Sequence, residues 1–114
     1  MNEVLRAKFE AARRSPLPVG PHTFTIRRPS PWDVATAQAN GQKLNLDWAA
    51  GFVVGWDLKA ADLIPGGDPE PVDFDPEIFR AWIKDYPDYW SALSKGVYAA
   101  YKQHEEALAA RGNV

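Results

Sequence analysis

The sequence contains no cysteine, which excludes a disulfide framework and a thiolate metal site. It also lacks an apolar run long enough to cross a bilayer, and its charged N-terminal stretch 1–14 has no apolar centre of the kind found in signal peptides. With 114 residues, the chain can bury about two-thirds of the surface of its unfolded state, enough for one modest core. We therefore expect a soluble intracellular protein with a single domain spanning residues 1–114.

Catalytic signatures are missing as well. The chain has two histidines; His22 falls in a stretch rich in proline and glycine, and His104 falls on a predicted helix. The motifs G-x-S-x-G and H-E-x-x-H and a phosphate-binding loop do not occur. Carboxylates are numerous, but they fall in a predicted loop or on exposed turns, where no apolar burial raises their pKa. The sequence thus predicts a protein that is not an enzyme and has no catalytic residue, cofactor or metal site.

The two ends of the chain differ in charge, although the formal net charge is only −2. Residues 1–30 contain six Lys or Arg and two Glu, whereas residues 31–114 contain seven basic and thirteen acidic residues. A basic leading segment can bind nucleic acid or an acidic partner. The alternative, a solvated helix face followed by an exposed strand edge, is favoured because no aromatic or glycine-rich element accompanies the charges, as it does in single-strand binders. Nucleic acid is therefore disfavoured as a partner.

Residues 1–22 are predicted to form an N-terminal helix and a linker that can move relative to a body of residues 23–114. The helix covers Asn2–Arg14, and its apolar residues recur at helical spacing. They are Leu5, Phe9 and Ala12. Because so short a helix is marginal in isolation, it docks on the body, docks on another subunit, or frays. Ser15–His22 contains three prolines and a glycine, a composition typical of a linker or turn.

One convincing strand follows at Thr23–Arg28, where polar and apolar residues alternate. Phe24 and Ile26 are expected to face the core. A single strand cannot satisfy its own edges. Its partner is predicted to be Leu17–Val19, Val72–Phe74 or another chain, and the unsatisfied edges predict a homo-oligomer.

Two helices are predicted in the middle of the chain. Ser30 and Asp33 form a capping-box-like start, with Asp where Glu or Gln is commoner, and this helix ends near Ala39, before Asn-Gly. Leu44–Trp56 is apolar on nearly every face and predicts a helix at the centre of the core. Its two glycines, Gly51 and Gly55, are interpreted as sites where another helix approaches closely.

Two further helices meet at an aromatic corner. Asp75 and Pro76 begin the first helix. Pro87 ends it and begins the last helix, which runs to about Arg111 and is longer than a small domain needs. The predicted fold class is mainly α with a minor β element (α+β): a compact helical domain with one or two short strands and a long C-terminal helix. The predicted core comprises Phe24, Ile26, Trp48, Phe52, Trp56, Phe79, Trp82, Trp90 and Leu93, with Trp82 and Trp90 facing Trp56.

Two surfaces are candidates for binding a partner. The first is the distal stripe of the last helix, which supplies apolar area. Its residues are Val97, Tyr101, His104 and Leu108. The second is the acidic loop Lys59–Asp73, in which Pro65-Gly66-Gly67 predicts a tight turn and whose carboxylates do not fit the spacing of an EF-hand. Its candidate contacts are Asp62, Asp68, Glu70 and Asp73.

The same region carries a family resemblance. A VVGWD block begins at Val53, and LIPGG-PEPV follows after a short spacer. FDP at 74–76 then opens a helix with an aromatic–Trp pair, and a proline–aromatic–Trp corner follows. With these motifs Phe52–Leu93 resembles the tail assembly chaperones of long-tailed, non-contractile bacteriophages and prophages, and Thr23–Ser30 is a looser match. The basic N-terminal helix departs from the family pattern, so no role is transferred to Arg6–Arg14.

The resemblance implies a non-catalytic protein of the host bacterial cytoplasm. Such chaperones bind the long helical tape measure protein, keep it soluble and help to recruit tail tube protein, and they are absent from the mature virion. Two other functions remain open from the residues alone. One is a structural component of the phage particle, such as a head–tail connector or minor tail protein. The other is a DNA-binding regulator that uses helix 31–39, which the acidic balance of the chain disfavours.

Overall fold

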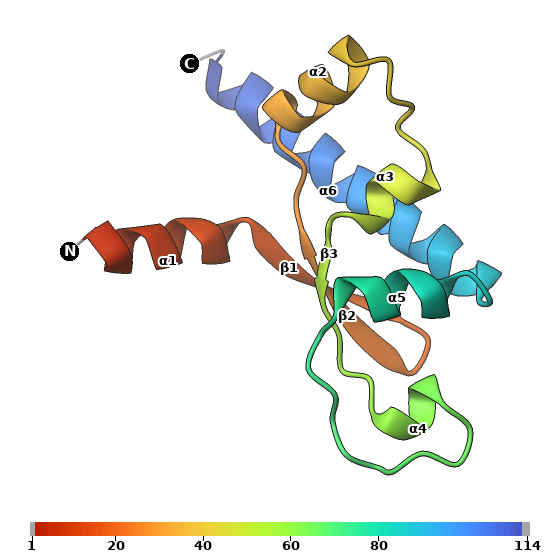
Figure 1. The fold of residues 1–114 in the computed structure, drawn as a ribbon. Coiled ribbons are helices and arrows are strands. Elements are labelled where there is room, and N and C mark those ends of the chain that lie inside the picture. The colour runs from red at the N-terminus through yellow and green to blue at the C-terminus, as the bar shows by residue number, and fades with distance from the viewer. Residues whose placement is uncertain (1, 113–114) are drawn as a thin grey trace.

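The computed structural model describes residues 2–112 and combines a small antiparallel sheet with six helices in this range (Figure 1). The elements follow the order α1 (Asn2–Ala12), β1 (Arg14–Val19), β2 (His22–Arg27), α2 (Pro31–Ala39), α3 (Leu46–Ala50), β3 (Val53–Gly55), α4 (Ala60–Leu63), α5 (Pro76–Ile83) and α6 (Pro87–Gly112). The sheet has the order β1-β2-β3. The predicted α+β class with a long C-terminal helix is confirmed, although the described part of the chain has three strands rather than one or two.

The prediction of a linker at Ser15–His22 is wrong, because most of this segment belongs to a β-hairpin. Of the proposed partners for the strand, Leu17–Val19 is confirmed. The hairpin closes with a two-residue turn in which Gly20 has φ +58°, as the first central residue of a type II′ turn requires. Counting from the Val19–His22 pair that closes the turn, Pro16 and Pro18 fall in the pairs without mutual hydrogen bonds, so their nitrogens point outward. Proline at these two positions therefore removes no hydrogen bond between β1 and β2. It also leaves the outer edge of β1 without two amide donors that another strand would need for pairing.

The prediction of a single helix at Leu44–Trp56 is also wrong, because the segment contains a short helix and a strand. Helix α3 begins at Asn45, whose Oδ1 accepts a hydrogen bond from the amide of Trp48 at 3.1 Å, and it ends at Gly51. The chain then becomes β3, which pairs with the free side of β2, and the carbonyl of Phe52 accepts from the amide of Arg27 at 2.7 Å. Two consecutive valines favour a strand at this edge. The glycines therefore do not mark a helix–helix contact.

The core lies between the inner face of the hairpin and the aromatic corner of α5 and α6. Phe24 is completely buried, and the ring centroids of Phe79, Trp82 and Tyr89 lie 6.1 to 6.3 Å from its own. All nine predicted core residues are buried or pack against the buried cluster. Trp82 does not face Trp56 as predicted. The aromatic neighbours of Trp56 are Phe74 and Phe79, whereas Trp82 packs against Phe24, Tyr86 and Tyr89.

The local signals for the other helices are confirmed. Ser30 Oγ accepts from the amide of Asp33 at 3.1 Å, and Asp33 Oδ2 accepts from the amide of Ser30 at 2.8 Å, which completes the capping box of α2. Asp75 Oδ1 caps α5 by accepting from two amides, at 2.9 and 3.1 Å. Pro87 begins α6, which has 26 residues and packs across β1 and α3.

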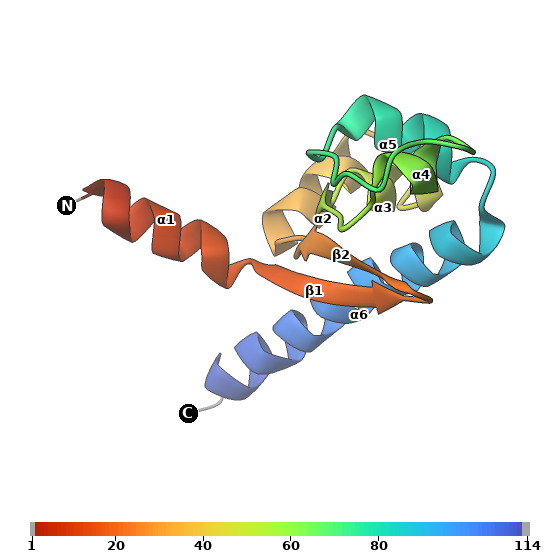
Figure 2. The ribbon, with the colours of Figure 1, turned by 90° about the horizontal axis from the view of Figure 1, so that it is seen from below.

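Helix α1 stands away from the rest of the chain (Figure 2). Its last residue is separated from β1 only by Arg13, so no linker lies between the helix and the sheet. None of its residues is buried, and its apolar side chains are open to solvent. These are Val4, Leu5 and Phe9. The structure therefore has no boundary between residues 22 and 23, because the sheet already begins at Arg14.

Candidate functional site

An apolar groove opens on the surface of the described part of the chain. It lies between α3, α5 and α6 and has a volume of about 270 Å³. The side chains along it are mostly apolar, and α5 and α6 supply four of the six principal ones: Leu46, Ala50, Phe79, Ile83, Trp90 and Leu93. Leu46 is half exposed at the mouth, whereas Phe79 and Leu93 belong to the core beneath. A groove of this kind suits the apolar face of a helix.

Arg80 forms one side of this groove. Its Nη1 donates to Oδ1 of Asp47 across the gap between α5 and α3. The same arginine also borders a second cavity of about 380 Å³, lined by residues such as Val53, Phe74 and Pro76. This ion pair is exposed, so it contributes little to stability.

The predicted distal stripe of α6 is divided by the fold. Val97 is fully buried against this chain's own core and cannot contact a partner. Tyr101 and His104 are half-buried and Leu108 is 40% exposed. The hydroxyl of Tyr101 donates a hydrogen bond to Glu105 Oε2 at 3.1 Å. The pKa of Tyr101 is raised, mainly by burial and further by this hydrogen bond and the charge of Glu105. The stripe thus offers a contact surface only from Tyr101 onward, where α6 extends past the sheet.

The acidic loop is more ordered than the sequence indicates. It contains α4, and a bridge joins Lys59 to Pro71. The predicted turn is present: Gly66 has φ +82°, and the amide of Gly67 donates to the carbonyl of Ile64 at 2.9 Å. Of the four candidate contacts, Asp68, Glu70 and Asp73 are exposed, and Asp62 is half-buried. Asp62 caps the start of α4, because its Oδ2 accepts from the amide of Lys59 at 2.8 Å.

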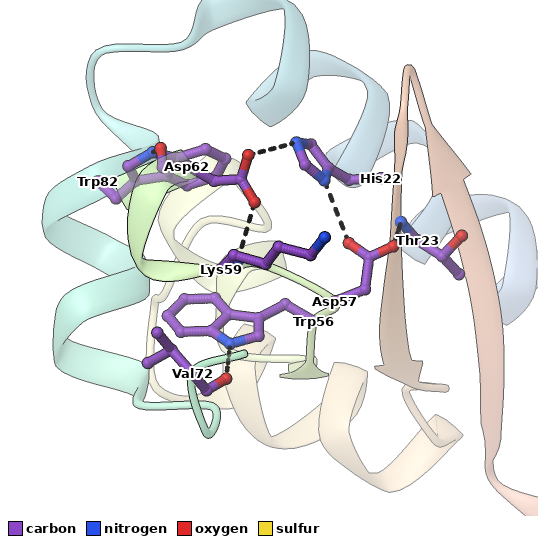
Figure 3. A network of polar contacts seen from close by, with 8 residues as sticks. All are labelled: His22, Thr23, Trp56, Asp57, Lys59, Asp62, Val72 and Trp82. Carbon is purple, nitrogen blue, oxygen red and sulfur yellow. Dashed lines mark hydrogen bonds and ion pairs between the residues drawn. The ribbon is translucent and has the colours of Figure 1, made fainter. Parts of the chain in front are cut away.

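His22, assigned to the linker by the sequence, lies at the centre of a polar network (Figure 3). Its Nδ1 is 3.2 Å from Asp57 Oδ1, and its Nε2 is 3.8 Å from Asp62 Oδ1. Asp57 Oδ2 also accepts from the amide of Thr23 at 3.0 Å, and the carbonyl of Asp62 accepts from Trp82 Nε1 at 3.3 Å. The network joins the hairpin turn to α4 and α5.

This network has the residue types of a catalytic site but not the arrangement. Both ring nitrogens of His22 face carboxylates of the same chain, so neither is directed at a substrate proton. The nucleophile that a Ser–His–Asp or Cys–His pair requires is not part of the network. We interpret the network as a structural connection. The signal that could have placed His22 is Val19-Gly20-Pro21-His22, in which two turn residues separate two apolar-alternating segments.

Two other features, a metal site and a membrane-spanning helix, can be assessed in the described residues. Within residues 2–112, no group of three or more His, Asp or Glu is placed so that it could hold a metal ion. None of the helices in this range combines the length and the apolar character that a membrane span requires.

Comparison of the chain with protein-family models, with curated proteins and with solved structures yields no match.

Proposed function

We propose that this chain is a tail assembly chaperone of a long-tailed, non-contractile phage or prophage. It binds the tape measure protein through apolar surfaces, keeps that protein soluble in the cytoplasm of the host cell and promotes assembly of the tail tube around it. It acts without catalysis and is absent from the mature virion.

One observation carries the proposal: the segment with the family resemblance, Phe52–Leu93, builds most of the apolar groove. Phe79, Ile83 and Trp90 come from its aromatic corner. A tape measure protein is long and helical, and an amphipathic helix binds in such a groove through side chains spaced three and four residues apart. The residues of the resemblance thus serve two purposes, since they form the core and also leave an apolar surface open beside it.

The test is co-expression with a tape-measure-like helical protein that is insoluble when it is expressed alone. We expect the wild-type chain to keep it in the soluble fraction without added nucleotide or metal. Leu46→Asp places a charge at the half-exposed mouth of the groove and should abolish this effect. Trp32→Asp is the matched control, because Trp32 is 78% exposed on α2, away from the groove.

A second pair of substitutions tests the distal stripe. Tyr101→Asp with Leu108→Asp alters the exposed part of α6 while the core upstream is unchanged. If this variant loses its partner and Leu46→Asp does not, the contact lies on the stripe rather than in the groove. If the wild-type chain fails to solubilise any such protein, or is found in purified virions at a fixed copy number, the chaperone function is wrong and a structural component takes its place.

A further inference from the structure

Four arginines lie at the open end of the hairpin: Arg13, Arg14, Arg27 and Arg28, called here the arginine cluster. Arg14 stands directly opposite Arg27 in the register of β1 and β2. The amide of Arg28 donates to the carbonyl of Arg13 at 2.7 Å, which brings the next two arginines together as well. Like charges opposite one another destabilise an antiparallel pair, so the fold is less stable for having them there.

Little negative charge within the chain compensates the cluster. Asp33 forms an ion pair with Arg27 at 3.7 Å. In the part of the chain that the structure describes, the ion pairs do not include the other three arginines. Burial, and then the charges of Arg13 and Arg27, lower the pKa of Arg28, while Asp33 raises it. The cluster therefore has capacity for further carboxylates.

The acidic loop has the opposite character. Asp68, Glu70 and Asp73 are exposed, and among residues 2–112 the ion pairs do not include them either. The backbone of Asp68 and Glu70 is held on α4, because the amide of Ala61 donates to the carbonyl of Asp68 at 2.9 Å and the amide of Ala60 donates to the carbonyl of Glu70 at 3.0 Å. Ile64, in the same loop, is 67% exposed. The loop thus presents exposed carboxylates and an exposed apolar side chain on a backbone that is hydrogen-bonded to α4.

These two surfaces lie at opposite ends of the hairpin (Figure 1). His22, beside the turn, contacts Asp57 just before the acidic loop begins, whereas Arg14 lies at the other end of β1. The six residues of β1, which rise about 3.3 Å from one to the next, separate its two end residues by about 17 Å. Helix α1 continues outward from the arginine end and exposes Leu5 and Phe9. The chain therefore cannot join its own two surfaces.

We propose that a second copy of this chain docks head to tail. The arginine cluster of one copy binds the acidic loop of the next, and the apolar face of α1 covers Ile64. Complementary surfaces at different places on one chain make a heterologous contact, which repeats from copy to copy as a ring or a filament. The contact stands on charge complementarity and on the exposed face of α1, so it does not depend on a role in tail assembly.

Two neutralising variants test the contact by sedimentation velocity at low salt. Arg14→Gln with Arg28→Gln alters only the cluster, and Asp68→Asn with Glu70→Gln alters only the loop. Each should weaken association of the chain by at least about tenfold, because each leaves charges on the opposing surface unmatched. An equal mixture of the two variants should form a dimer that does not grow further, since only one intact cluster and one intact loop remain in each pair.

Matched controls remove charge elsewhere on the surface. Lys84→Gln with Lys95→Gln, and Asp85→Asn with Asp88→Asn, change the same numbers of exposed charges and should associate like the wild type. Association of the wild type should also decrease as salt approaches about 1 M, where the screening length is only about 3 Å. Circular dichroism checks that each variant retains its helices.

Three results would overturn the proposal. One is a wild-type chain that stays monomeric at low salt and micromolar concentration. Another is a mixture of the two variants that remains monomeric while the controls associate. The third is a monomeric wild type that binds a labelled DNA duplex and loses that binding with the arginine substitutions, because the cluster would then be a nucleic-acid site.

Discussion

Leu17 lies directly over Gly96, where β1 crosses α6. A Cβ built at Gly96 would be 2.8 Å from Cδ1 of Leu17 and closer still to Cδ2. The absent side chain is what allows the strand and the helix to approach this closely. This is the close approach that the sequence assigned to Gly51 and Gly55, and it joins a strand to a helix rather than two helices.

Gly96→Val should therefore push β1 away from α6 and destabilise the fold by about 1–3 kcal/mol. Leu17→Ala should relieve the clash, so that the double variant is less destabilised than the sum of the single variants. Urea denaturation of the three variants measures the coupling, and a value of about 1 kcal/mol or more is expected. Additive effects would mean that the two residues do not press on each other in solution.

Trp82→Ala should reduce the free energy of unfolding by about 3–5 kcal/mol, because it removes a buried ring and leaves a cavity. The ring packs between Phe24 and Tyr89, and its Nε1 donates to Asp62. Chemical denaturation is the measurement, and Trp32→Ala on the exposed side of α2 should change stability by less than about 0.5 kcal/mol. An unchanged midpoint for Trp82→Ala would show that the aromatic corner is a surface patch.

His104 should titrate below the ordinary histidine value of about 6.5. Desolvation by burial lowers its pKa, and the charges of Arg28, Arg13 and Arg111 lower it further. Because the unfolded chain then binds more protons than the folded one, this residue makes stability fall as pH falls from about 6.5 toward the lowered folded pKa, and no further below that value. NMR titration of the imidazole gives the midpoint directly. Arg28→Gln should raise this midpoint. A midpoint unaffected by the substitution would mean that the charge of Arg28 does not act on His104.

Pro16→Thr with Pro18→Thr should open the edge of β1. Both prolines face outward, so their replacement supplies two amides to the solvent edge without altering the ladder to β2. The folded stability should change little, while association through strand pairing should increase and should resist salt. Light scattering at high salt measures this effect, with Pro69→Thr in the exposed loop as the control. Equal scattering from both variants would mean that the prolines do not protect the edge.

Elements with local causes could be predicted from the amino-acid sequence. The capping box of Ser30 and Asp33, the cap at Asp75 and the start of α6 at Pro87 act through neighbouring residues and are where the pattern predicts, whereas α5 ends earlier than predicted, at Ile83. The alternation at Phe24 and Ile26 also identified the buried face of β2, since side chains on a strand alternate whatever the strand pairs with.

The conformation of the remaining segments depends on contacts with residues distant in the chain. Proline at 16 and 18 signals a linker until pairing with β2 shows that the missing amides point outward. Phe52–Gly55 has the apolar character of a buried helix. It forms a strand edge instead, because the backbone of β2 on the side away from β1 has hydrogen-bonding groups that an extended segment can pair with. The groove, the His22 network and the arginine cluster likewise combine residues far apart in the chain. Pairing and packing place them together, and no local pattern records which distant residues will meet.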